Sequence, residues 1–408
     1  MPSARSFLCR TMLLLTLLTV ATGSACAQDK RITHQIGFDL RPAYVVPTHS
    51  FFDGNNRTGE PVHQMNSVHL KYAFRFNPNT RWGSLYPHAY QGIGISYNRF
   101  DNPGAMGSPV GVYVFQGSRI ARLTDALSLD YEWNFGASFG WKKGRVEEEI
   151  DAGNRENIYY NEITGSAINA YINASFLLNW QLSPHWNLAA GIDLTHYSNG
   201  NTHYPNAGIN LIGGRIGLVH TFGRDTEEST AASSSLAPKY SSHFCYDVVL
   251  YGATRKQGFT QDNGHAQLLP GVFGVAGFNF TPLYSFNKYF RAGISLDAQY
   301  DESSNLKEYY VGEENNGHPH FYRPPFYKQF GIGLSARAEL SMPIFSIGIG
   351  IGHNVIYHGA DNGDFYQILA LKTFLTRSLF LHVGYQLNKF QYPNNLMLGV
   401  GWRFHGKK

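Results

Sequence analysis

A histidine and a serine stand two residues apart in the stretch HYSNGNTHYPNAGIN, which covers residues 196–210. A serine hydrolase needs a nucleophile, a base within hydrogen-bond reach of it and a third group that orients the base. Residues i and i+2 have neighbouring side chains on one face of a strand, so His196 could accept the proton of Ser198. The spacing fits nucleophilic chemistry, but a histidine-serine pair alone is a weak motif. Its meaning depends on the element that carries it.

The composition is typical of a transmembrane β-barrel. Aromatic residues make up 15% of the chain, charged residues another 15%, and 43 of the 408 residues are glycine. Charged residues account for about 25% of an ordinary globular domain. Low charge combined with abundant aromatic residues and glycine suits membrane-spanning strands. The formal net charge of +4 is too small to indicate nucleic-acid binding.

The N-terminus has the pattern of a secretory signal peptide. A basic start precedes an apolar stretch from Met12 to Val20, and the sequence ACA at 25–27 forms an A-x-A cleavage site. We therefore expect residues 1–27 to be removed. After this segment, no window approaches the ~18 consecutive apolar residues that a membrane helix requires.

Strict period-two alternation predicts long strands. From Leu127 to Trp141 every odd position is apolar or aromatic and every even position is polar or glycine. A soluble sandwich would also alternate, but its strands average only about five or six residues. We expect sixteen strands, near 33–48, 67–78, 89–101, 108–123, 127–142, 166–182, 186–199, 208–222, 245–259, 267–284, 289–303, 326–341, 345–358, 364–375, 379–390 and 395–404.

The connections divide the chain into two similar halves. Short turns alternate with long polar loops, the pattern of outer-membrane barrels, but the Ser/Ala-rich segment 223–243 is long on the short-turn side and is typical of a linker. Each half ends in a glycine five residues before a phenylalanine, in GLVHTF and GVGWRF. We therefore expect an all-β fold of two antiparallel up-and-down eight-stranded barrels, 28–222 and 244–408. The alternative is one sixteen-stranded barrel.

The depth of the histidine-serine pair follows from the strand that begins at Trp186. Alternation places Trp186, Ile192 and Leu194 on the lipid-facing side, and His196 and Ser198 continue that row. Ten residues at ~3.3 Å rise and ~40° tilt climb about 25 Å, the height of the apolar band. The pair should therefore lie where outer-leaflet acyl chains meet their headgroups, which is the level of lipid ester bonds. A histidine at this level is more often an interfacial residue than a base.

The run His196-Tyr197-Ser198-Asn199, followed by PNAG at 205–208 and a glycine-rich strand, resembles the signature of the outer-membrane lipid A 3-O-deacylases, the PagL family. The resemblance covers roughly residues 30–222. It implies an eight-stranded barrel with a serine-histidine-glutamate triad on its outer wall, which removes the 3-O-linked hydroxyacyl chain of lipid A. It further implies Ser198 as the nucleophile, His196 as the base and Asn199 near an oxyanion hole.

The third member of the triad departs from the family pattern. The position that matches the family's glutamate is Asn210, on the apolar face of the following strand. An amide can orient a histidine but cannot balance the charge of an imidazolium; in a serine protease, replacing the carboxylate by an amide lowers kcat by about four orders of magnitude. Glu162, in the loop before the sixth strand, is a candidate substitute acid.

The second half does not repeat the motif. Lys389 and Gln391 stand where the first half has His196 and Ser198, and we expect neither a metal site in GHNVIYHGADNGD at 352–364 nor any cofactor. This half is expected to support the first, to form a homodimer surface or to bind lipopolysaccharide. Two functions remain open: a lipid A acyl-ester hydrolase in the bacterial outer membrane, or a non-catalytic outer-membrane barrel, structural, adhesive or lipopolysaccharide-binding, with a degenerate site.

Overall fold

The computed structural model describes residues 31–144, 162–222, 240–260, 266–269, 271–313, 319–363, 365–390 and 392–406. The expected signal peptide, 1–27, and residues 223–239 of the expected linker lie outside this part of the chain. Among the described residues, no helix is long and apolar enough to cross a bilayer.

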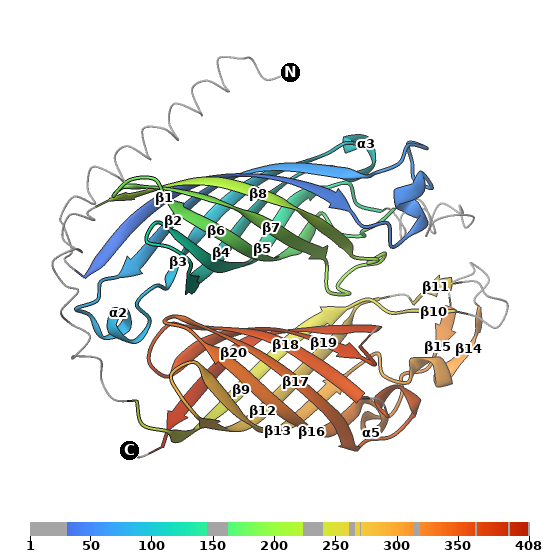
Figure 1. Cartoon of the computed structure of the whole chain (residues 1–408). Helices are drawn as coiled ribbons and strands as arrows, with labels where there is room; N and C mark the ends of the chain where they lie inside the picture. The colour runs from blue at the N-terminus through green and yellow to red at the C-terminus, as the bar shows by residue number, and fades with distance from the viewer. Residues whose placement is uncertain are drawn as a thin grey trace, which may run out of the picture.

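The long strands close into two separate antiparallel barrels of eight strands each (Figure 1). The first barrel contains β1 (Ile32–Val45), β2 (Gln64–Phe76), β3 (Tyr90–Phe100), β4 (Gly107–Arg122), β5 (Leu127–Trp141), β6 (Ile168–Gln181), β7 (Trp186–Ser198) and β8 (Ile209–Phe222). The second contains β9 (His243–Arg255), β12 (Phe273–Ser285), β13 (Phe290–Asp301), β16 (Phe330–Ser341), β17 (Phe345–Ile356), β18 (Phe365–Phe374), β19 (Leu379–Asn388) and β20 (Tyr392–His405). The two-barrel expectation is confirmed, and the single sixteen-stranded barrel is wrong.

Successive side chains of a strand point to opposite faces. The alternation of the sequence therefore places polar residues in the barrel interior and apolar residues on its exterior. On β5 the polar residues Ser128, Asp130, Glu132 and Asn134 are buried, whereas the aromatic residues between them face outward. This is the reverse of a soluble barrel and suits strands surrounded by lipid. Pairing of the last strand with the first closes each barrel, so neither presents a free edge.

A network of buried charges fills the middle of the first barrel. The Asp39 carboxylate lies 2.9 Å from both the Arg41 and the Arg215 guanidinium and 3.1 Å from the Lys71 ammonium. Glu132 lies 2.8 Å from Arg215 and 3.0 Å from Lys71. Pairing these charges offsets the cost of removing them from water.

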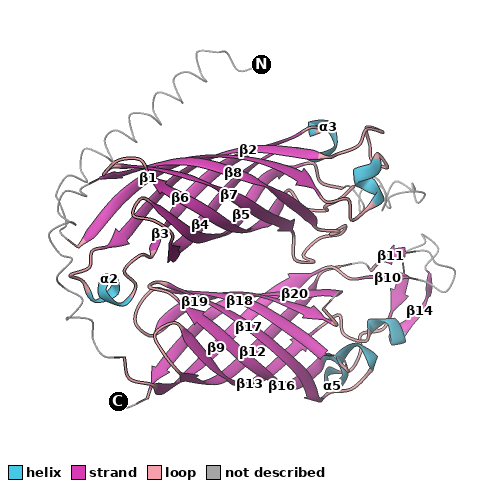
Figure 2. Cartoon of the chain, viewed as in Figure 1, coloured by secondary structure: helices cyan, strands magenta, loops and turns pink. Residues whose placement is uncertain are grey.

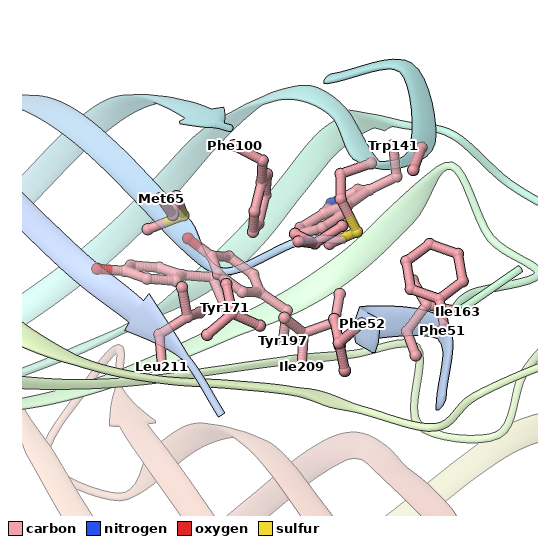
Figure 3. Packing of buried hydrophobic residues seen from close by; sticks show 14 of the residues in the cluster. Phe51, Phe52, Met65, Phe100, Trp141, Ile163, Tyr171, Tyr197, Ile209 and Leu211 are labelled. Carbon is pink, nitrogen blue, oxygen red and sulfur yellow. The ribbon is translucent and has the colours of Figure 1, made fainter. Parts of the chain in front are cut away.

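Aromatic side chains fill the lumen at the level where β7 ends (Figure 3). The ring of Tyr197 stacks on Tyr171 at 5.4 Å and meets Trp141 edge-on at 5.0 Å. Phe51 and Phe52, from the loop after β1, belong to the same buried cluster. Since Tyr197 is the residue between the histidine and the serine of the motif, this packing fixes the end of β7.

Short elements occupy the ends of the barrels (Figure 2). They are η1 (Ser50–Asp53), α2 (Arg81–Leu85), α3 (Pro103–Met106), β10 (Gly258–Thr260), β11 (Ala266–Leu268), η5 (Leu306–Tyr309), β14 (Tyr310–Glu313), β15 (Pro319–Phe321), α5 (Phe326–Gln329) and η6 (Ala360–Asn362). β10 pairs with β11 and β14 with β15 as two small sheets. The strand expected at 267–284 is thus divided, because its first residues pair within a loop rather than in the barrel wall.

The two barrels lie side by side (Figure 1). At the short-turn end, the Tyr86 hydroxyl donates a hydrogen bond of 2.6 Å to the backbone oxygen of Lys288. At the opposite end, the Lys256 backbone N–H donates to the Asn201 oxygen at 3.0 Å. Contacts at both ends therefore hold one wall of the first barrel against one wall of the second.

Candidate active site

The histidine of the motif is oriented by an amide on the neighbouring strand. His196 on β7 and Asn210 on β8 are partners in the strand register, and both lie on the outer wall. Their side chains meet, with 2.7 Å between His196 Nδ1 and Asn210 Oδ1. With the amide oxygen as acceptor, Nδ1 carries the hydrogen and Nε2 is left with a lone pair. This is the tautomer that a histidine needs to act as a base through Nε2.

Ser198 lies on the same outer wall, two residues along β7, and lines one cavity together with His196. A glycine makes room for the imidazole. Gly208 has a φ of +74°, and a Cβ atom at this position would lie 3.2 Å from His196 Cε1. The positive φ lets the turn reach β8 while its backbone passes close to the ring. The structure thus brings together His196, Ser198 and Asn210 on one wall.

Asn199 has another role in the structure. Its side-chain amide donates to the Pro205 oxygen at 3.2 Å and to Thr164 Oγ1 at 3.3 Å, and the residue is buried. Its backbone N–H donates to Asn206 Oδ1 at 3.0 Å. Asn199 therefore stabilises the turn, and its side chain is not brought to the wall that carries Ser198. Asn206, from the PNAG stretch at 205–208, lines the cavity instead.

Glu162, the candidate substitute acid, pairs with another partner. Its carboxylate forms an ion pair with the guanidinium of Arg57, from the loop after β1. The structure therefore joins Glu162 to Arg57, while the imidazole Nδ1 of His196 contacts Asn210.

A cavity of about 450 Å³ lies between the two barrels and begins at the histidine-serine pair. Its lining is almost entirely apolar outside that pair and the adjoining turn. The residues from the first barrel include Trp133, Phe135, Ala170, Ile172, His196, Ser198, Asn206, Ala207 and Gly208. Those from the second include Ile347, Leu369, Leu371, Val383, Tyr385, Leu387 and Leu396. Sequence reasoning missed this wall, because periodicity does not reveal which outward face meets another barrel.

In the second half of the chain, Lys389 and Gln391 stand at the positions that match His196 and Ser198. Lys389 follows directly after β19 with a φ of +54°, and Gln391 and Asp364 lie outside the described residues. The Asp361 carboxylate accepts the backbone N–H of Asn305 at 2.8 Å. In the described ranges, no group of three or more His, Cys, Asp or Glu residues is placed to hold a metal ion.

Comparisons with solved structures give weak likenesses to outer-membrane proteins. The crystal structure of the outer membrane enzyme PagL has a TM-score of 0.29 and 12% identity, over 45% of this chain and 97% of that one. The FrpB iron transporter from Neisseria meningitidis has a TM-score of 0.23 and 10% identity, over 92% of this chain and 71% of that one. The Acinetobacter baumannii outer membrane protein Omp33 has a TM-score of 0.15 and 9% identity, over 92% and 99%. At such scores, the fold rests on the strand pairing described above.

Family comparisons cover both halves of the chain. Residues 155–219, which contain the site, match the family model of the lipid A 3-O-deacylase (PagL). Residues 244–406 match the model of the acyloxyacyl hydrolase C-terminal domain (PagL_C). No curated protein matches the sequence significantly. The resemblance stated for the first half therefore extends to the second, and the chain is an outer-membrane protein that belongs to the PagL family of acyloxyacyl hydrolases.

Proposed function

We propose that the chain is a lipid A acyl-ester hydrolase that removes the 3-O-linked acyl chain of lipopolysaccharide, with Ser198 as nucleophile and His196 as base. The observation that carries this proposal is the 2.7 Å contact between His196 Nδ1 and Asn210 Oδ1. It leaves Nε2 available to the Ser198 hydroxyl on the same wall. The reaction is acyl transfer to an oxygen nucleophile and needs no cofactor.

The reaction follows from the arrangement of these groups. His196 Nε2 takes the proton of Ser198 as Oγ bonds to the ester carbonyl carbon, which gives a tetrahedral oxyanion. The bond between that carbon and the sugar oxygen then breaks, and the departing oxygen takes the proton from the imidazolium. Water, activated by the same imidazole, releases the fatty acid from Ser198. Amide groups of Asn206 and Gly208, both at the cavity, are the candidate donors to the oxyanion.

Asn210 favours a second candidate function. An amide holds the imidazole but supplies no negative charge when the imidazolium forms, so catalysis should be slower than with a carboxylate. A non-catalytic outer-membrane barrel that retains lipopolysaccharide binding would tolerate this residue. The two functions differ in whether lipid A loses an acyl chain.

Mass spectrometry of lipid A from a host with and without the gene tests the proposal. The parent protein should remove the mass of one hydroxyacyl chain, and Ser198→Ala or His196→Ala should restore it while both barrels remain heat-modifiable in electrophoresis. Lys389→Ala and His353→Ala are matched controls in the second half and should behave as the parent. Unchanged lipid A in the presence of folded parent protein would reject the hydrolase and leave the non-catalytic barrel.

A further inference from the structure

The cavity beside Ser198 is closed at its deep end by a contact between the barrels. Trp133 on β5 meets Phe345 on β17 edge-to-face, with 5.1 Å between ring centroids, and its indole N–H lies 3.4 Å from Met342 Sδ. These residues belong to one apolar cluster with Leu371. The first barrel thus rests on the second immediately below the cavity.

The cavity is also bounded near the nucleophile. The turn after β7 packs on Leu396 of β20, since a Cβ atom at Gly200 would lie only 2.6 Å from Leu396 Cγ. The strand registers align Trp133 with Ala174, and Ala174 with Leu194, four residues below Ser198. Four residues at ~3.3 Å per residue correspond to about 13 Å along the wall. The space is therefore an elongated slot of limited length.

We propose that this space is an acyl slot, in which the outer wall of the second barrel holds the chain of the scissile ester and selects it by length. The proposal rests on the proposed hydrolase function. The second-barrel side of the slot is formed by Leu369, Val383, Leu387 and Leu396. The occupant follows from chemistry: the acyl chain is attached to the carbon that Ser198 attacks, and the slot is the apolar space that begins there.

The size of the slot suits a hydrocarbon chain. Its volume of about 450 Å³ is roughly three times that of an engineered apolar cavity that binds one benzene molecule. The lining offers no charged side chain from the second barrel, as an alkyl chain requires. A phosphate or sugar group would lose its hydrogen bonds there.

Selection by length follows from the lipid surroundings. A chain that moves from the bilayer into the slot exchanges one apolar environment for another, so transfer itself gives little preference. The fit of the chain to the slot decides instead. A short chain leaves empty space, whereas a long chain meets Trp133, which packs on Phe345 at the closed end. The second barrel would then determine which ester is cleaved without touching the reacting atoms.

The test is hydrolysis of two lipid A esters, one with a short and one with a long acyl chain, by the purified full-length protein in mixed micelles. Val383 pairs with Leu371 near the closed end. Val383→Trp should lower the long-to-short rate ratio about tenfold or more, and Val383→Ala should raise it. Ile294→Trp is the matched control, because Ile294 is 64% exposed on the outer face of β13 and should leave the ratio unchanged. A ratio that is the same in the parent and both Val383 variants overturns the slot.

A second measurement separates the slot from the hydrolase. An ester with a photoreactive group at its chain end is irradiated with Ser198→Ala protein, and cross-linked peptides are identified by mass spectrometry. Cross-links on β18 and β19 support the slot, and cross-links spread over the outer face around Ile294 overturn it. Cross-links in the slot without hydrolysis by the parent would reject only the proposed function; hydrolysis without them would reject only the slot.

Discussion

Replacing Asn210 by aspartate is expected to accelerate deacylation. Asparagine and aspartate have the same shape, so a carboxylate oxygen would take the place of Oδ1, 2.7 Å from His196 Nδ1. A neutral hydrogen bond contributes about 0.5–1.5 kcal/mol and one to a charged group about 1.5–3 kcal/mol. The bond strengthens when the imidazolium forms, so the barrier should fall by about 1–2 kcal/mol, which is about 5- to 30-fold in rate.

This gain is smaller than the factor of about ten thousand that a serine protease loses when its carboxylate becomes an amide. Part of that loss reflects the wrong histidine tautomer. Here Asn210 already accepts from Nδ1, so the tautomer is held and the charge of the imidazolium alone remains to be stabilised. A carboxylate near the membrane interface costs about 0–1 kcal/mol of barrel stability, which the fold should tolerate.

The assay is the initial rate of fatty-acid release by the purified parent and Asn210 variants. Asn210→Glu should also exceed the parent, but by less than Asn210→Asp, because its side chain is longer by one methylene. Asn210→Leu, which has no acceptor, should be slower than the parent. An aspartate variant no faster than the parent, together with a leucine variant of unchanged rate, would show that Asn210 does not orient the histidine.

Three other predictions test separate features of the structure. Gly208→Val should abolish deacylation while the barrels stay folded, because the new Cβ would lie 3.2 Å from His196 Cε1 at a residue with a positive φ. Mass spectra of lipid A would show the loss of deacylation, and normal deacylation would contradict the prediction. Glu132→Gln removes a buried carboxylate from the charge network and should lower the free energy of unfolding in urea by about 3–5 kcal/mol; unchanged stability would argue against that network. Trp133→Ala and Phe345→Ala form a double-mutant cycle, in which the free energies of unfolding should show a coupling energy of about 0.5–1.5 kcal/mol. A coupling energy of zero would contradict the contact between the barrels.

Periodicity predicted most of the fold, because a barrel strand is a local pattern of period two. The strand expected near 127–142 is β5, Leu127–Trp141, and the one expected near 186–199 is β7, Trp186–Ser198. The small sheets formed by β10 with β11 and by β14 with β15 were not foreseen, since their strands are too short to show a period.

For the site, parity predicted the shared face of His196, Ser198 and Asn210, but the second wall of the cavity could not be predicted. Leu369 and Leu371 occupy the same outward row of β18 and both line the cavity. Leu369 is nevertheless 45% exposed and Leu371 only 8%, because Leu371 also lies in the apolar contact with the first barrel. Alternation distinguishes outside from inside. It does not distinguish lipid from a neighbouring barrel, because both are apolar.

The two walls of the acyl slot belong to a single polypeptide. A site shared between separate chains would fall apart as the chains are diluted in the membrane, and its activity per molecule would rise with surface density. Because one chain carries both walls, the effective concentration of one wall at the other is fixed. Deacylation per molecule should therefore be independent of expression level, so that even a few copies in an outer membrane would each act as a complete unit.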